Sequence, residues 1–189
     1  MKKILLVFIA VIIIAVIAFM LSRSQTVGVT NNASNQPSNF YPNNMTLSSP
    51  AFQDGQILPK KYTCDGSNVN PPLQFSDIPA GTKSLALIVD DPDAPSGDFV
   101  HWLIWDMDPG LTAIAEGNAP TGTQGKTSTN STGYVPPCPP SGTHRYTFKL
   151  YALDTLLGIP SAFGKEQLLA AMEGHILAKG ELIGRYSKS

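Results

Sequence analysis

The chain has 189 residues, with 13 basic and 14 acidic side chains and two cysteines. Three of the basic residues, Lys2, Lys3 and Arg23, precede residue 45, so residues 45–189 carry a net charge of −4. Nucleic-acid binding needs concentrated positive charge, and this balance argues against such a partner.

The chain begins with two lysines and an uninterrupted apolar run from Ile4 to Leu21. Eighteen residues in a helix measure about 27 Å, close to the hydrocarbon thickness of a bilayer. Positive charge is concentrated before this run, so the positive-inside rule places the N-terminus in the cytoplasm and the rest of the chain outside. We therefore expect residues 1–21 to be an uncleaved membrane anchor. The alternative is a cleaved signal peptide and a secreted domain.

Residues 22–44 are rich in Asn and Ser and show no apolar period. Such a stretch buries too little apolar surface to offset the entropy lost on ordering, so it is expected to be a flexible linker. Residues 45–189 are long enough for a single domain with a full hydrophobic core.

Short segments of β-type pattern then follow one another, separated by clusters of Pro, Gly and Asp. The expected strands are Met45–Ser49, Leu73–Phe75, Ser84–Asp90, His101–Met107, Arg145–Asp154 and Glu181–Tyr186. One helix is expected over Lys165–Glu173, with Leu168, Leu169 and Met172 on one face and its end at Gly174. The pattern predicts an all-β antiparallel sandwich with a minor helix.

Residues 115–143 form the longest segment without a periodic pattern, which is typical of a functional or mobile loop. It contains the proline-dense stretch VPPCPP and therefore Cys138. In an oxidising compartment the isolated pair Cys64 and Cys138 is expected to form a disulfide, with two buried free thiols as the alternative. The spacing offers too few ligands for a metal site, and no cofactor is expected.

Three polar side chains extend apolar rows at the ends of expected strands. Asp91 continues the alternate apolar positions of 85–89, and Tyr146 begins the corresponding row of its strand. His101 is expected to share its face with Leu103 and Trp105. Buried polar groups need partners, so these three side chains are expected either to satisfy one another or to meet a ligand at one mouth of the sandwich.

These residue types suit an anionic ligand. His101, His144 and Tyr146 can donate hydrogen bonds, while Asp91 can hold an imidazolium and raise its pKa. A ligand that carries both a phosphate and an amine would satisfy all four. Structural alternatives stay open, since aspartates often form turns and a lone histidine is often a core residue. Asp90, on the opposite face, is assigned no role in the pocket.

Several motifs together resemble the phosphatidylethanolamine-binding protein family, also called the Raf kinase inhibitor-like family, in its bacterial and archaeal branch. They are KYTCDGSNVNPPLQF at 61–75, DPDAP at 91–95, HWLIW at 101–105, PPCPPSGTHRYTF at 136–148 and LLAAMEGHILAKGELIGRY at 168–186. The resemblance implies a β-sandwich of antiparallel sheets with a small pocket for phosphate or phosphoethanolamine-like groups. The implied ligand-binding residues are Asp91, His101, Cys138, Pro139, His144 and Tyr146, and the expected rim residues are Asp93, Tyr134 and Arg145.

The function expected from the sequence is a non-catalytic binding protein, anchored in a membrane and facing outward, that holds a small phosphorylated or zwitterionic ligand. One alternative is a regulator that inhibits a protease or kinase partner. A hydrolase that uses Asp and His is the least favoured of the three.

Overall fold

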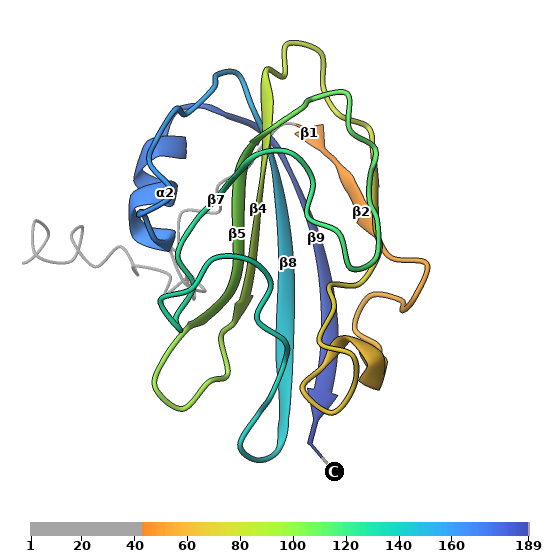
Figure 1. Ribbon diagram of the computed structural model, residues 1–189. Helices are drawn as coiled ribbons and strands as arrows, with labels where there is room; N and C mark the ends of the chain where they lie inside the picture. Colours follow the sequence, from red (N-terminus) through yellow and green to blue (C-terminus); the bar gives the residue numbers. More distant parts are fainter. Residues whose placement is uncertain (1–42, 189) are drawn as a thin grey trace, which may run out of the picture. The chain divides into compact units, whose positions relative to one another are not determined.

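The computed structural model describes residues 43–188, which form two sheets packed face to face (Figure 1). The larger sheet has the order β1-β9-β8-β4-β5-β7, and the smaller has the order β2-β3-β6. All neighbouring strands are antiparallel except β1 and β9, which pair in parallel. The strands are β1 (Asn43–Asn44), β2 (Thr46–Ser48), β3 (Leu73–Ser76), β4 (Ser84–Asp91), β5 (Phe99–Met107), β6 (Ala113–Ile114), β7 (Thr123–Gln124), β8 (Thr143–Leu153) and β9 (Ile176–Ser187). The helices are η1 (Lys60–Tyr62) and α2 (Lys165–Met172).

The antiparallel sandwich with a minor helix is confirmed, and each of the six expected strands is present. The longest strand, β9, runs over Ile176–Ser187 rather than Glu181–Tyr186. The additional strands β1, β6 and β7 have two residues each, which is too short for a periodic signal.

The expected anchor at 1–21 and the first 21 residues of the expected linker lie outside the described residues. The last two linker residues, Asn43 and Asn44, form β1 and pair with Ala178 and Lys179 of β9. Within residues 43–188, no helix has the length and hydrophobicity needed to cross a bilayer.

The main core fills the space between the two sheets. Strand alternation supplies it, because every second side chain of a strand points to the same face. The larger sheet contributes Leu85, Leu87, Val89, Trp102, Ile104, Phe148 and Leu150, and the smaller sheet contributes Leu47, Leu73, Phe75 and Ile114.

A second apolar cluster lies on the outer face of the larger sheet, where α2 covers it. Leu168 and Met172 of α2 are fully buried there, but Leu169 is 40% exposed. The predicted helix face is therefore wrong at Leu169, because consecutive residues are about 100° apart around a helix. Gly174 has a φ of 79° directly after the helix, which confirms the predicted stop.

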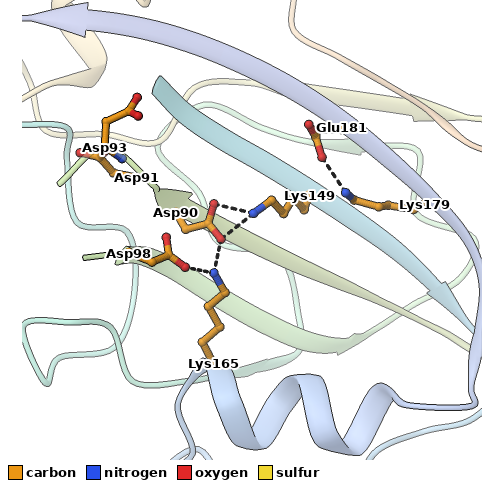
Figure 2. A network of polar contacts seen from close by, with 8 residues as sticks. All are labelled: Asp90, Asp91, Asp93, Asp98, Lys149, Lys165, Lys179 and Glu181. Atoms are coloured by element: carbon orange, nitrogen blue, oxygen red, sulfur yellow. Dashed lines mark hydrogen bonds and ion pairs between the residues drawn. The ribbon is translucent and has the colours of Figure 1, made fainter. Parts of the chain in front are cut away.

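Asp90 anchors α2 to the sheet through buried charge (Figure 2). Its side chain is fully buried and accepts hydrogen bonds from Nζ of Lys149 at 2.8 Å and from Nζ of Lys165, the first residue of α2, at 2.5 Å. Lys165 also pairs with Asp98. Burial by itself would lower the pKa of Lys165, but the bonds to Asp90 and Asp98 outweigh it and raise that pKa. Asp90 is thus the principal acceptor of a buried network that the sequence pattern did not indicate.

Replacing Asp90 with Ala in the full chain should lower the free energy of unfolding by about 3–5 kcal/mol, because two lysines would lose their buried partner. Urea denaturation followed by tryptophan fluorescence measures this loss. Glu181→Ala is the matched control, since it breaks the more exposed Lys179–Glu181 pair and should cost at most about 1 kcal/mol. Equal losses in the two variants would contradict the role given to Asp90.

Candidate ligand-binding pocket

A cavity of about 320 Å³ opens at the end of the larger sheet where β4 ends and where β5 and β8 begin. In Figure 1 this end lies toward the labelled C-terminus. The cavity walls come from two strand connections and from the strand ends themselves. The lining residues are Asp91, Ala94, Pro95, Ser96, Phe99, His101, Thr129, Val135, Pro136, Cys138, Pro139, Pro140, His144 and Tyr146.

Asp91 and His144 form a buried pair in the cavity wall. The side chains are 5% and 8% exposed, and His144 Nδ1 lies 2.7 Å from Asp91 Oδ2. The other carboxylate oxygen accepts the backbone N–H of Asp93 at 2.9 Å. Since a carboxylate accepts from an N–H, this contact places a proton on Nδ1 of His144 and holds the orientation of the ring. Among the described residues, no hydrogen bond forms to Nε2 of His144.

His101 faces the same cavity and is also buried. Its Nδ1 lies 2.7 Å from the carbonyl oxygen of Val135, and the ring of Tyr146 packs edge-on at 5.2 Å between centroids. Burial lowers the pKa of His101 despite the opposing effects of the Val135 carbonyl and of Asp91. Asp91 pairs with His144, and at His101 the effect of burial on the pKa outweighs the raising effect of this carboxylate. The neutral ring donates from Nδ1–H and leaves Nε2 as an acceptor.

His101 reaches the cavity because β5 is irregular at this point. The register shifts between Val89, which pairs with Trp102, and Asp90, which pairs with Val100. The extra residue on β5 reverses the alternation. Leu103 and Trp105 consequently face the α2 side, with Val100, whereas His101 faces the cavity. The predicted common face for His101, Leu103 and Trp105 is wrong, although His101 does lie beside Asp91 and Tyr146.

Tyr146 supplies a buried hydroxyl that makes no hydrogen bond of good geometry to another described residue. Its side chain has no solvent exposure, and its hydroxyl oxygen has no protein hydrogen-bond partner within residues 43–188. Burial raises the pKa of Tyr146, followed by the negative charge of Asp91 and a weak hydrogen-bonding contribution from the same carboxylate, so the phenol stays protonated. The hydroxyl therefore lies near the Asp91 carboxylate without a hydrogen bond of good geometry to it, and it can donate to a group in the cavity.

The proline-rich wall of the cavity is tied to the body of the domain by a disulfide. Cys138 is bonded to Cys64, with 5.4 Å between the Cα atoms and a sequence separation of 74. The backbone N–H of Cys64 also donates to the carbonyl of Pro137 at 3.0 Å. The expected disulfide is confirmed in the structure. In the chain-entropy model, a disulfide that closes a loop of this length adds at most about 4 kcal/mol to the free energy of unfolding.

The three expected rim residues are not part of the cavity lining. Asp93 and Arg145 pair with each other beside it, with Arg145 Nε and one terminal nitrogen at 2.8 and 2.7 Å from the carboxylate oxygens. Tyr134 turns away, donating its hydroxyl to the carbonyl of Tyr62 at 2.9 Å and packing edge-on against Trp102. Its place is at the edge of the main core.

The structure adds wall residues that sequence reasoning did not assign. Phe99 and Val135 flank His101, and Ala94, Pro95 and Ser96 come from the connection after β4. The sequence indicated that the segment with the prolines at 136 and 140 is rigid, but it did not indicate that these prolines face the cavity. Thr129 comes from the loop at 115–143, where no local pattern indicated contact with the site.

The fold and the pocket define a β-sandwich binding protein, and comparison with known proteins gives its family. The family model described as phosphatidylethanolamine-binding protein matches residues 48–187. The chain belongs to the phosphatidylethanolamine-binding protein family.

Relatives of this chain occur in bacteria and in archaea. A protein of Chlamydia muridarum is 49% identical over 149 residues, which cover 76% of this chain and 99% of the relative, and it bears only the name UPF0098 protein. A relative from Methanothermobacter thermautotrophicus with the same name is 48% identical over 150 residues, with the same two coverages. Neither name describes an enzyme.

Two solved structures share the fold. A homologue of phosphatidylethanolamine-binding protein from Chlamydia trachomatis superposes with a TM-score of 0.75 at 47% identity, covering 78% of this chain and 99% of that one. YbcL of E. coli, described as a new member of the mammalian family, has a TM-score of 0.72 at 28% identity, covering 77% and 99%.

Proposed function

We propose that the pocket captures a small phosphorylated or zwitterionic ligand without transforming it. The observation that carries this proposal is the hydroxyl of Tyr146, a buried donor close to the Asp91 carboxylate that makes no hydrogen bond of good geometry among the described residues. An unsatisfied buried polar group costs about 1–3 kcal/mol, so a ligand oxygen bound there would recover that cost. The hydroxyl lies in the same cavity as two imidazoles, which gives the ligand several polar partners.

The ring nitrogens that the two histidines leave free suit a phosphoryl group. Nδ1 of His101 is engaged by Val135, and Nδ1 of His144 is engaged by Asp91, so in each ring only Nε2 remains for a ligand. A phosphate oxygen can share a proton with Nε2 of His101 while another oxygen accepts from Tyr146. The proton comes either with the phosphate monoester or from solvent.

Asp91 contributes to ligand binding mainly through the position of its negative charge. Both of its oxygens already accept hydrogen bonds, from His144 and from the backbone of Asp93. Its charge is therefore directed into the wall, where it repels an anion less than a free carboxylate would. The amine of a zwitterionic ligand can still approach this negative charge, which favours phosphoethanolamine-like ligands over phosphate.

We further propose that the domain faces the outside of the cell, anchored by residues 1–21. The Cys64–Cys138 disulfide supports this location, because disulfides persist in oxidising compartments. Fractionation of cells that express the full chain, followed by protease treatment of intact cells, is the test. We expect a membrane-bound chain that external protease removes, and a chain protected inside intact cells would contradict the proposal.

Tyr146→Phe should weaken the binding of phosphoethanolamine and phosphate by about 10- to 150-fold, because a hydrogen bond to a charged group contributes about 1.5–3 kcal/mol. Isothermal titration calorimetry gives the affinities. Tyr134→Phe is the matched control, since it removes the same atom from a tyrosine outside the cavity lining and should leave affinity unchanged. Unchanged affinity in Tyr146→Phe would contradict the proposal that this cavity binds the ligand.

Sulfate should bind more tightly as the pH falls from about 8 to 5, because binding promotes protonation of a histidine. Burial lowers the pKa of His101 in the free protein, whereas a bound dianion raises it. Between these two pKa values each binding event takes up a proton, and below the lower one the gain levels off. Calorimetry in buffers of different ionisation enthalpy measures the uptake. His101→Asn, which leaves His144 in place, should reduce it, and an uptake that persists unchanged would contradict this role for His101.

A further inference from the structure

A second hollow, which we call the arginine groove, lies directly beside the pocket. Its volume is about 490 Å³, and apart from Gly142 its lining side chains are all polar. The lining residues are Asp93, Ser141, Gly142, Thr143, His144, Arg145 and Arg185. His144 lines both the groove and the pocket, so the two spaces adjoin at this residue.

The groove gathers both arginines of residues 43–188, although this part of the chain is acidic overall. Arginine presents a planar fork of donors that matches carboxylate and phosphate oxygens. The two arginines lie side by side because of the register of the sheet, in which Arg145 of β8 pairs directly with Arg185 of β9. Directly opposite side chains share a face in an antiparallel pair, and like charges there are destabilising unless an anion lies between or beside them.

One of the two arginines is already neutralised. Asp93 accepts the backbone N–H of Arg145 at 2.9 Å as well as two guanidinium hydrogen bonds. These bonds, with burial opposing them, lower the pKa of Asp93 to about 2, so the carboxylate is charged at neutral pH and is committed to Arg145. Arg185 is exposed and has no ion pair among the described residues. The groove therefore retains one uncompensated positive charge.

We propose that the arginine groove is a second anion subsite, and that the ligand carries a second anionic group beside the phosphoryl group held in the pocket. This inference rests on the proposed function of the pocket. The phosphoryl group binds at His101 and Tyr146, the ligand passes His144, and its second carboxylate or phosphate pairs with Arg185. The ligand class is thus a phosphorylated small molecule with at least two anionic groups, of which phosphoserine is the simplest zwitterionic example.

The test compares ligands that differ by one anionic group. Phosphoserine is phosphoethanolamine with an added carboxylate, and alkanediol bisphosphates of increasing length are compared with the matching alkyl monophosphates. Calorimetry on the full chain should show that the best doubly anionic ligand binds about tenfold more tightly than the matching ligand with one anionic group. One charge-assisted hydrogen-bonded pair contributes enough binding free energy for this difference. Glycerophosphoserine, compared with glycerophosphoethanolamine, shows whether a lipid headgroup has the same preference as a free monoester.

Arg185→Gln should abolish this preference while leaving the affinity for phosphoethanolamine within about twofold, because Arg185 does not line the pocket. Lys83→Gln is the matched control, since it removes an exposed positive charge beside the opposite end of β4 and should preserve the preference. The subsite is overturned if no doubly anionic ligand exceeds its counterpart, or if the preference survives in Arg185→Gln. Failure of phosphoethanolamine and phosphate to bind at all would overturn the proposed function together with the subsite.

Discussion

Two consecutive carboxylates, Asp90 and Asp91, are buried at the end of β4. A buried charge needs partners, and the structure around these two residues supplies them. The strand directs them to opposite faces of the larger sheet. On the outer face, Asp90 accepts from Lys149 and Lys165 and thereby fixes the start of α2. On the other face, Asp91 holds His144 and the turn at Asp93. The same two residues thus attach the helix and organise the pocket.

The pocket wall depends on a second constraint, which acts on a segment with little regular structure. The disulfide holds Cys138 to Cys64, and the backbone of this segment meets the sheet where the carbonyl of Val135 faces His101. Prolines restrict φ on both sides of the cysteine, so few conformations of the wall remain once the disulfide is closed. A rigid wall against a strand end keeps the polar groups of the cavity in fixed positions. Among them, the ring of Tyr146 packs edge-on against the ring of His101.

Charge is distributed unevenly over an acidic domain. The carboxylates at the pocket end are paired: Asp91 pairs with His144, and Asp93 pairs with Arg145. Arg185 remains without such a pair among residues 43–188. The region around the pocket is consequently less repulsive toward anions than the net charge of the domain indicates, because local pairing offsets its carboxylates.

Local periodicity and turn residues were enough to predict the β-sandwich, the six longer strands and the position of α2. The group of Asp91, His101, His144 and Tyr146 was predicted from strand alternation together with the resemblance to the family motifs. Only the tertiary structure decided the face on which His101 lies, because a shift in strand pairing is not visible in one strand's pattern. The same holds for the buried partners of Asp90, for the neutral state of His101 and for the meeting of Arg145 with Arg185. Each of these depends on which side chains distant in sequence come together, and on how far burial outweighs charge at that place.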